Sequence, residues 1–251
     1  MDAEVGELAC KTLGPGRLPP VEMIIEMMES VLSKKDLVDE SILITAGPTQ
    51  EALDPIRFIT NHSSGKMGFA LAAAAHRRGA TVILVSGPTS LAVPGGVRFV
   101  PVTSAVEMRD AVMRNLDQAT VVIKAAAVAD YRPARMSGSK IKKTEKPLTL
   151  SLERNPDIIA EVGALKGNRI LIGFAMETES LVENARSKLA AKNMDFIVAN
   201  DLRTPDAGFK ADTNIVKIID RSGHVESIPL MEKIDVADRI LDRIVLAKVR
   251  S

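Results

Sequence analysis

From Ser41 onward the chain alternates between short apolar segments and longer amphipathic ones, and this alternation constrains the fold more than any other feature. Apolar, mostly β-branched runs predict strands at residues 42–45, 81–86, 97–102, 121–129, 170–174 and 196–199. Helical spacing predicts helices at residues 65–79, 106–116, 155 onward and 179–192. Strands separated by helices pair mostly in parallel, through right-handed crossovers. The sequence therefore predicts a three-layer, Rossmann-like α/β fold with a mostly parallel sheet.

Two segments depart from the strand–helix repeat. Residues 214–220 and 224–228 flank Ser222-Gly223 and predict a C-terminal hairpin, followed by an amphipathic helix over residues 237–249. Residues 138–152 carry a lysine cluster and a predicted strand at 148–152, where apolar residues alternate with polar ones. This second segment predicts an excursion from the fold or a dimerisation arm.

The first 40 residues differ from the rest of the chain. Prolines and glycines between residues 13 and 20 argue against regular structure there, because they interrupt both helix and strand. Residues 21–32 then show helical spacing and are followed by a polar linker. We therefore divide the chain into residues 1–40, too few to fold alone, and one domain over residues 41–251.

Composition excludes several classes of protein. A net charge of +1 does not favour broad attraction to nucleic acid or membranes, and 3% aromatic residues leave little for stacking on bases. The single cysteine allows no internal disulfide, as in proteins of a reducing cytoplasm. No apolar run reaches the roughly 20 residues of a membrane span, and the N-terminus lacks a signal-peptide pattern. We expect a cytoplasmic protein without nucleic-acid or membrane partners.

The stretch from Asp130 to Lys143 carries the strongest chemical signal. Asp130 ends an apolar run, and Lys140, Lys142 and Lys143 follow a turn-rich segment. In open α/β sheets ligands bind at the carboxyl ends of the strands. There Asp130 either holds magnesium or a nucleotide hydroxyl, or caps a turn. The lysines either neutralise phosphate, Lys140 foremost, or protect an exposed edge. We interpret this stretch as the centre of a nucleotide-using enzyme.

A second candidate is the junction between the first strand and the helix after it. The turn at Gly47 and the loop through Ser63, Ser64 and Gly65 offer backbone amides, hydroxyls and the positive end of a helix dipole to phosphate oxygens. The loop matches neither the Walker P-loop nor the dinucleotide G-x-G-x-x-G pattern. Phosphate binding and simple glycine packing are both compatible with it.

Other candidates each have a structural and a functional interpretation. Asn61 either bonds its own backbone in a turn or donates its amide to an oxyanion during acyl transfer. Phe174 belongs either to the core or to the apolar wall of a base pocket. Lys188 and Lys192 share one helix face, which is ordinarily solvated. With three histidines in the chain, a histidine metal cluster is not expected, and His62 is assigned a structural role.

Several segments, taken in order, resemble one enzyme family. They are ITAGPTQEALDPIRFITNHSSGKMG, AAAVADYRP, KIKK, NPDII, GFAMET and ANDL followed by GF-K-AD-TN. From about residue 41 to the C-terminus the chain is similar to phosphopantothenate–cysteine ligase, the ligase half of the bifunctional bacterial coenzyme A biosynthesis enzyme. The combination of NHSSGKMG, AAVADYR and KIKK is highly specific.

The resemblance implies a reaction in two steps. CTP, accompanied by magnesium, activates the carboxylate of 4′-phosphopantothenate as an acyl-cytidylate and releases pyrophosphate. The amine of L-cysteine then displaces CMP and gives 4′-phosphopantothenoylcysteine. Family members form homodimers, partly through the arm that carries KIKK.

The resemblance also implies roles for individual residues. Asn61 corresponds to the asparagine that assists the attack of cysteine, and Lys140 to the lysine that forms the acyl-cytidylate. Arg57 corresponds to a residue that reaches substrate across the dimer. Lys124 stands where a small residue is expected, and the position acts there through its backbone. The implied contacts to CTP are Gly47, Ser63, Ser64, Gly65, Lys124, Ala125, Ala126, Asp130, Lys140, Pro156, Asp157, Ile158, Ile159, Phe174, Lys188 and Lys192.

The N-terminal residues resemble the end of the partner decarboxylase of the fused enzyme. Cys10 and Gly14-Pro15-Gly16-Arg17 fall in register with its Cys-Gly-Asp-x-Gly-x-Gly-Arg-Met loop, but Lys11-Thr12 replaces Gly-Asp and Leu18 replaces Met. The flavin-binding body of that enzyme has no counterpart in these residues. We therefore expect no bound flavin and no decarboxylase activity, and interpret the chain as a fragment or derivative of a fused enzyme.

Two other functions remain open from the sequence. A nicotinamide-dependent oxidoreductase would suit a Rossmann sheet, although G-x-G-x-x-G does not follow the strand at residues 42–45. A non-catalytic nucleotide-binding or dimerisation module would bind CTP without turnover. The residue pattern also leaves open the choice between CTP and ATP, the number of magnesium ions, and the residues that hold the substrate phosphate.

Overall fold

A computed structural model describes residues 4–7, 10–143, 147–177, 181–201 and 211–249 and confirms the predicted α/β class. Its central sheet has eight strands in the order β14-β13-β12-β11-β8-β3-β6-β7. The strands from β12 to β7 pair in parallel, whereas β13 and β14 are antiparallel and form the predicted C-terminal hairpin. The strands are β3 (Ser41–Ala46), β6 (Thr81–Ser86), β7 (Arg98–Pro101), β8 (Val121–Lys124), β11 (Ile170–Glu177), β12 (Phe196–Asp201), β13 (Thr213–Asp220) and β14 (Val225–Glu232).

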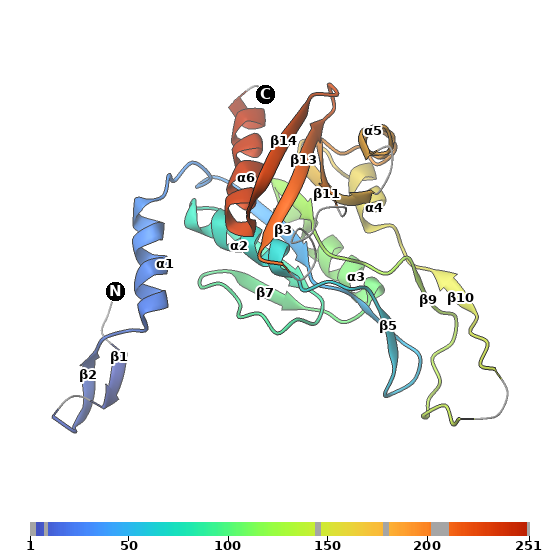
Figure 1. Ribbon diagram of the computed structural model, residues 1–251, viewed down its shortest axis with the longest axis horizontal. Helices are drawn as coiled ribbons and strands as arrows, with labels where there is room; N and C mark the ends of the chain where they lie inside the picture. Colours follow the sequence, from blue (N-terminus) through green and yellow to red (C-terminus); the bar gives the residue numbers. More distant parts are fainter. Residues whose placement is uncertain (1–3, 8–9, 144–146, 178–180, 202–210, 250–251) are drawn as a thin grey trace.

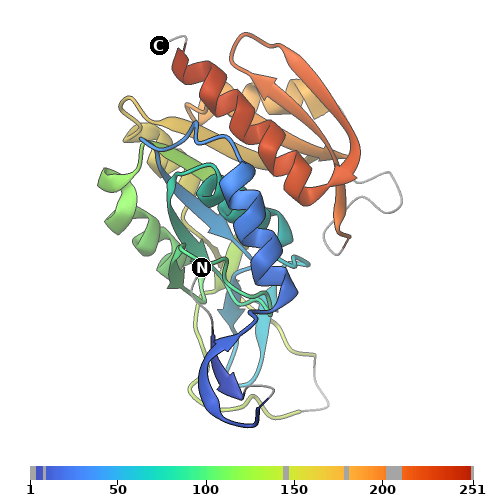
Figure 2. The same ribbon diagram turned by 90° about the vertical axis from the view of Figure 1, so that its left-hand side faces the viewer.

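Helices cover both faces of this sheet, which gives the predicted three layers (Figures 1 and 2). One face packs against α2 (Lys66–Arg77) and α6 (Lys233–Val249). The other packs against α3 (Ala105–Asn115), which continues into a 3₁₀ turn (Leu116–Gln118), and against α4 (Ile158–Ala164) and α5 (Leu181–Ala191). The parallel strands thus run in the Rossmann order, which reverses between β3 and β8.

The β3 strand shows why these residues form a central strand. Its apolar residues are fully buried, and successive side chains enter opposite layers: Ile42 and Ile44 join the layer under α2 and α6, and Leu43 joins the layer under α3 and α4. Burial on both faces is typical of a parallel strand between helices and accounts for its continuous apolar sequence.

Glycines let α2 lie directly on the end of β3. A Cβ built on Gly68 would come within 2.5 Å of Ala46 Cβ and 3.2 Å of the Thr45 carbonyl oxygen. Gly47 and Gly65, at φ +72° and +80°, adopt a conformation that other residues rarely take, and a Cβ on Gly65 would lie 3.3 Å from Gly47 Cα. The turn after β3 and the start of α2 are therefore packed backbone to backbone.

The predicted strand over residues 121–129 is too long. β8 ends at Lys124, and Asp130 lies in the loop beyond it. Past Lys124 the pairing becomes irregular. The Ala127 amide still donates to the Gly47 carbonyl oxygen at 2.9 Å, but the Ala126 amide donates to Thr45 Oγ1 at 3.2 Å and the Ala129 amide to Thr49 Oγ1 at 3.0 Å. Side chains from a distant segment thus take the place of backbone partners for two of the amides beyond β8.

Three other boundaries also differ from the prediction. The helix after Asn155 begins at Ile158, capped by Asp157, because Asn155 instead donates to the Ala129 carbonyl oxygen at 2.8 Å. The strand predicted at residues 148–152 is β10 (Leu152–Arg154), and the closing helix begins earlier than expected, at Lys233. The first residues of the helix predicted at 179–192 lie outside the described residues.

The N-terminal segment stands away from the body of the domain (Figure 1). The helix predicted over residues 21–32 is confirmed as α1 (Val21–Leu32). Contrary to expectation, the glycine- and proline-rich stretch forms an edge strand, β2 (Leu13–Arg17), paired with β1 (Glu4–Glu7). Proline is tolerated at a sheet edge, where its nitrogen needs no partner. Among the described helices, none is both long and apolar enough to cross a membrane.

Two antiparallel ribbons extend from the body as arms (Figure 1). One pairs β4 (Gln50–Ala52) with β5 (Phe58–Thr60), and the other pairs β9 (Tyr131–Pro133) with β10. Asp54 joins them: it accepts hydrogen bonds from Arg57 Nη2 at 2.6 Å and from the Ile141 amide at 3.0 Å. Arg57 Nη2 also donates to the Ile141 carbonyl oxygen at 2.9 Å. This contact fixes the lysine-bearing segment against the β4–β5 ribbon.

The glycine contact predicts a stability change. Gly68→Ala should lower the free energy of unfolding by about 1–3 kcal/mol, because a Cβ there forces α2 away from β3. Gly95→Ala is the matched control, since a Cβ at Gly95 meets nothing within 4 Å. Urea unfolding of both variants measures the difference. A Gly68→Ala protein as stable as the control would show that α2 can shift without cost.

The Asp54 contact predicts protection of the arm. Arg57 and the Ile141 amide hold the pKa of Asp54 well below its usual range. The stabilisation is therefore present above the unfolded aspartate pKa of about 3.9 and is lost as the pH falls through the folded value. We expect Asp54→Ala to remove hydrogen-exchange protection of the Ile141 amide at neutral pH, and Asp39→Ala, in the exposed linker, to preserve it. Equal protection in both variants would contradict the assignment.

Candidate functional site

A cleft of about 520 Å³ lies at the carboxyl ends of β8, β11 and β12, beside the point where the strand order reverses. This is the position where open α/β sheets bind ligands. Its lining comes from several elements: the loop that opens α2, the segment after β8, residues of β11 and β12, Ile159 of α4, Lys188 of α5 with Lys192 just after that helix, and Asn214 and Lys233 on the β13 side. The predicted site residues among them are Asn61, Ser63, Ser64, Gly65, Lys124, Ala125, Ala126, Asp130, Ile159, Phe174, Lys188 and Lys192.

An adjoining hollow of about 340 Å³ holds three more of the predicted residues, Pro156, Asp157 and Ile158. Lys124, Val128, Asp130 and Lys192 line both cavities. The two cavities are thus parts of one site, and residues far apart in the sequence meet there because β8 and β11 are neighbours in the sheet.

The loop before α2 presents an anion-binding surface. Gly65 caps the helix without a side-chain hydrogen bond, and the first helical turn contains no acidic residue. Ser63 Oγ accepts a hydrogen bond from the Gly65 amide at 3.3 Å. Backbone amides and the positive helix end therefore face the cleft, as phosphate sites require. Gly47 does not line the cleft; it packs beneath Gly65 and shapes the loop from below.

Asn61 spans the cleft wall rather than bonding within its own turn. Its Nδ2 donates to the carbonyl oxygens of Ala127 at 3.3 Å and Val128 at 3.2 Å. These contacts tie the base of the β4–β5 ribbon to the segment that follows β8. The side chain is exposed at the cleft, where a substrate can reach it.

Lysines dominate the charge of the cleft. Its described lining residues include one carboxylate, Asp130, and five lysines: Lys66, Lys124, Lys188, Lys192 and Lys233. Lys192 Nζ also contacts Asp157 Oδ2 at 2.8 Å in the adjoining hollow. The cleft therefore attracts a polyanion more strongly than the net charge of +1 implies.

The pKa values of two groups reflect this crowding. Burial lowers the pKa of Lys124, although part of its side chain contacts solvent, and the charge of Lys192 lowers it further, against the attraction of Asp157 and Asp130. Burial raises the pKa of Asp157, but hydrogen bonds from Lys192 and the Ala160 amide outweigh it, and the pKa lies below its usual value. Asp157 is thus a carboxylate paired with Lys192.

Sequence reasoning missed a polar group at the β12–β13 side of the cleft. Asn214 is 2% exposed and donates to Asn200 Oδ1 at 3.2 Å. Lys233 is 7% exposed and its Nζ donates to the carbonyl oxygens of Ala211 and Thr213. Lys66 Nζ pairs with Asp212 at 2.6 Å. The sequence left Lys233 between the strand predicted to end at residue 228 and the helix predicted to start at residue 237, whereas β14 extends to Glu232 and α6 begins at Lys233.

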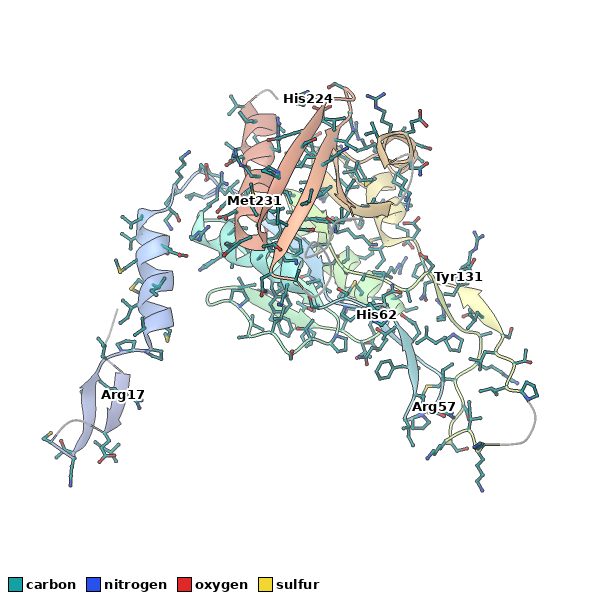
Figure 3. All side chains as sticks on the ribbon, viewed as in Figure 1. Arg17, Arg57, His62, Tyr131, His224 and Met231 are labelled. Atoms are coloured by element: carbon teal, nitrogen blue, oxygen red, sulfur yellow. The ribbon has the colours of Figure 1, made fainter. Side chains whose placement is uncertain are left out.

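Lys140 and Arg57 do not line the cleft or the adjoining hollow. Both belong to the arms, where Arg57 contacts Ile141, the neighbour of Lys140. Figure 3 shows Arg57 far along the β5 ribbon and His62 at its base near the body. The structure therefore divides the predicted residues into a cleft set and an arm set.

The residues around the cleft offer limited ligation for magnesium. In the described part of the chain, no group of three or more His, Cys, Asp or Glu side chains could hold a metal ion. Asp130 supplies one carboxylate at the cleft. One carboxylate suits an ion held mainly by nucleotide phosphates and water, which is how magnesium ordinarily accompanies a nucleotide.

Comparisons with known proteins agree with this geometry. Coenzyme A biosynthesis bifunctional protein CoaBC of Bacillus subtilis (strain 168) is 49% identical over 243 residues, covering 95% of this chain and 60% of that protein. A crystal structure of the C-terminal domain of CoaBC matches with a TM-score of 0.76 at 44% identity, covering 87% of this chain and 100% of the other. A Cab2 mutant in complex with phosphopantothenate-cysteine shares the fold, with a TM-score of 0.68 at 16% identity over 93% and 97% of the two chains.

The chain thus spans about 60% of the length of the curated relative it matches. The family described as the DNA/pantothenate metabolism flavoprotein C-terminal domain matches residues 37–247, which is most of the chain. Since the strand order, the cleft and both kinds of comparison agree, the chain belongs to this family.

Proposed function

We propose that the chain joins L-cysteine to 4′-phosphopantothenate with consumption of CTP, as the ligase half of a bifunctional coenzyme A biosynthesis enzyme. The observation that carries this proposal is the cleft itself: lysines, a helix-terminal anion site and an exposed asparagine amide converge at the strand-order reversal. The relatives named for coenzyme A biosynthesis support it. A protein of the same fold in complex with phosphopantothenate-cysteine supports the choice of substrates.

In the first step a carboxylate oxygen of phosphopantothenate attacks the α-phosphorus of CTP. The bond from that phosphorus to the bridging oxygen breaks, and pyrophosphate leaves with the electron pair. Lys124, Lys188 and Lys192 lie where they can offset the negative charge that spreads over the phosphates. Magnesium would be held by the phosphates together with Asp130 and would neutralise part of the same charge.

In the second step the cysteine amine attacks the acyl carbon, the bond to the cytidylate oxygen breaks, and CMP departs. The nitrogen loses its proton to solvent. We assign to Asn61 the stabilisation of the oxyanion that forms on the acyl oxygen, because its amide lies at the cleft wall. In the free protein the same amide donates to the Ala127 and Val128 carbonyl oxygens.

The substrate phosphate requires a second anion site. We assign it to the polar group at the β12–β13 side of the cleft, together with the start of α2. Lys66 and Lys233 supply positive charge there, and Asn214 supplies an amide. The nucleotide phosphates then occupy the opposite side, near Lys188 and Lys192.

We further propose that the chain acts as a homodimer in which each arm reaches the cleft of its partner. Lys140 and Arg57 belong to the proposed chemistry but do not line their own cleft. The arms also expose apolar side chains that a partner would cover. These are Ile56, Phe58, Tyr131, Met136, Leu148, Leu150 and Leu152.

A pyrophosphate assay tests the proposed reaction. With phosphopantothenate and magnesium, CTP should support pyrophosphate release, and CMP should appear only when cysteine is added. Lys140→Ala should reduce pyrophosphate release by about 10²–10³-fold, since one charge-stabilising contact is lost. Asn61→Asp should release pyrophosphate but accumulate the acyl-cytidylate. Lys143→Ala is the matched control and should reduce release far less. Folded protein that is inactive with both CTP and ATP would overturn the assignment.

Mixing two variants tests the exchange of arms. Co-expressed Lys140→Ala and Asn61→Asp chains form mixed dimers in which one of the two clefts has an intact Asn61 and an intact Lys140 from the partner. Purified mixed dimers should therefore recover about half of the wild-type rate. If Lys140 serves the cleft of its own chain, each cleft contains one defect and no activity returns.

A further inference from the structure

We propose that the side chain of Lys124 binds the phosphates of the nucleotide and takes up a proton as they bind. This inference rests on the proposed function and deepens it, because it gives the nucleotide site a proton-linked contact. The expected role of position 124 was through its backbone alone. The side chain adds a cation at the junction of the two cavities.

The position of Lys124 supports direct contact with an anion. It is the last residue of β8, the strand beside the reversal of the sheet order, and its side chain lines both cavities. Its backbone is fixed from both sides, because β8 pairs with β3 at Thr45 and with β11 at Gly173. An anion that extends from one cavity into the other must therefore pass this ammonium group.

The charges around Lys124 set how easily it is protonated. Lys188 of α5 and Lys192, just after this helix, line the same cleft. Asp157 comes from the start of α4, and Asp130 from the loop after β8. Lys66 and Lys233 complete the cationic lining across the cleft. Burial and Lys192 together lower the pKa of Lys124 more than the two aspartates raise it.

Binding of a polyanion reverses this balance. Phosphate oxygens next to the ammonium favour its charged form, so the pKa of Lys124 rises toward the ordinary lysine value of about 10.4. At a pH between the pKa of Lys124 in the free protein and its pKa in the complex, binding of the nucleotide must draw a proton from solution. Affinity for the nucleotide then falls as the pH rises through this window, because the proton becomes harder to supply.

Titration calorimetry of the full chain with magnesium and CTP tests this directly. At each of several pH values between neutral and the ordinary lysine pKa of about 10.4, titrations in buffers of different ionisation enthalpy report the number of protons taken up per nucleotide. Wild type should show net uptake. Lys124→Arg keeps the charge but does not titrate in this range, so it should bind CTP without that uptake. Lys124→Met should bind about 10- to 100-fold more weakly, also without uptake.

One control locates the proton. Lys34→Met, in the exposed linker, should keep both affinity and uptake. Undiminished uptake in Lys124→Arg would overturn the inference, and so would wild-type affinity in Lys124→Met.

The result is separable from the proposed reaction. Nucleotide binding with proton uptake, but without ligation when all substrates are present, would contradict the proposed function and leave the role of Lys124 intact. If wild type and Lys124→Met ligate at the same rate and with the same KM for CTP, the role of Lys124 is contradicted and the proposed function stands.

Discussion

The close packing of α2 on the end of β3 is the constraint on which the site depends. Gly68 lets the helix lie directly on Ala46, and Gly47 and Gly65 fit against each other at positive φ. A side chain at any of the three would move the start of α2, and with it the amides that face the cleft. The phosphate binding proposed for this loop would therefore depend on backbone packing rather than on any one polar side chain.

The position of the arms, in contrast, depends on one carboxylate rather than on backbone packing. Asp54 is 2% exposed and holds Arg57 and the Ile141 amide, which are 84 residues apart in the sequence. The contact places two cationic side chains of the proposed reaction on a projecting ribbon instead of in the cleft. In the proposed homodimer, the cleft of one chain and the arm of its partner together would form the site, so the proposed chemistry would depend on assembly.

Sequence patterns predicted those elements whose position depends on residues close together in the sequence. The β-branched run of β6 and the helix before it were found because residues 81–86 are apolar and Gly79, at φ +95°, ends the turn after α2. The end of β8 was missed because the hydroxyls of Thr45 and Thr49 lie about 80 residues earlier and leave no mark on residues 125–129. Lys233 and Asn214 were missed for the same reason, since only the strand order brings them to the cleft. The cleft residues predicted through family resemblance were mostly brought together, whereas pattern alone had left each of them with a structural alternative.

The Rossmann strand order by itself would equally suit a dinucleotide. The charges of the cleft are therefore what favour a nucleotide with several phosphates. Five lysines around one carboxylate repel one another in the free protein, and this repulsion opposes folding. Part of it is relieved by Asp157 on Lys192 and by Asp212 on Lys66, both placed just outside the cleft rather than within it. Within the proposed function, a nucleotide with several phosphates neutralises the charge of these lysines on binding, and a ligand with less negative charge would relieve less of their repulsion.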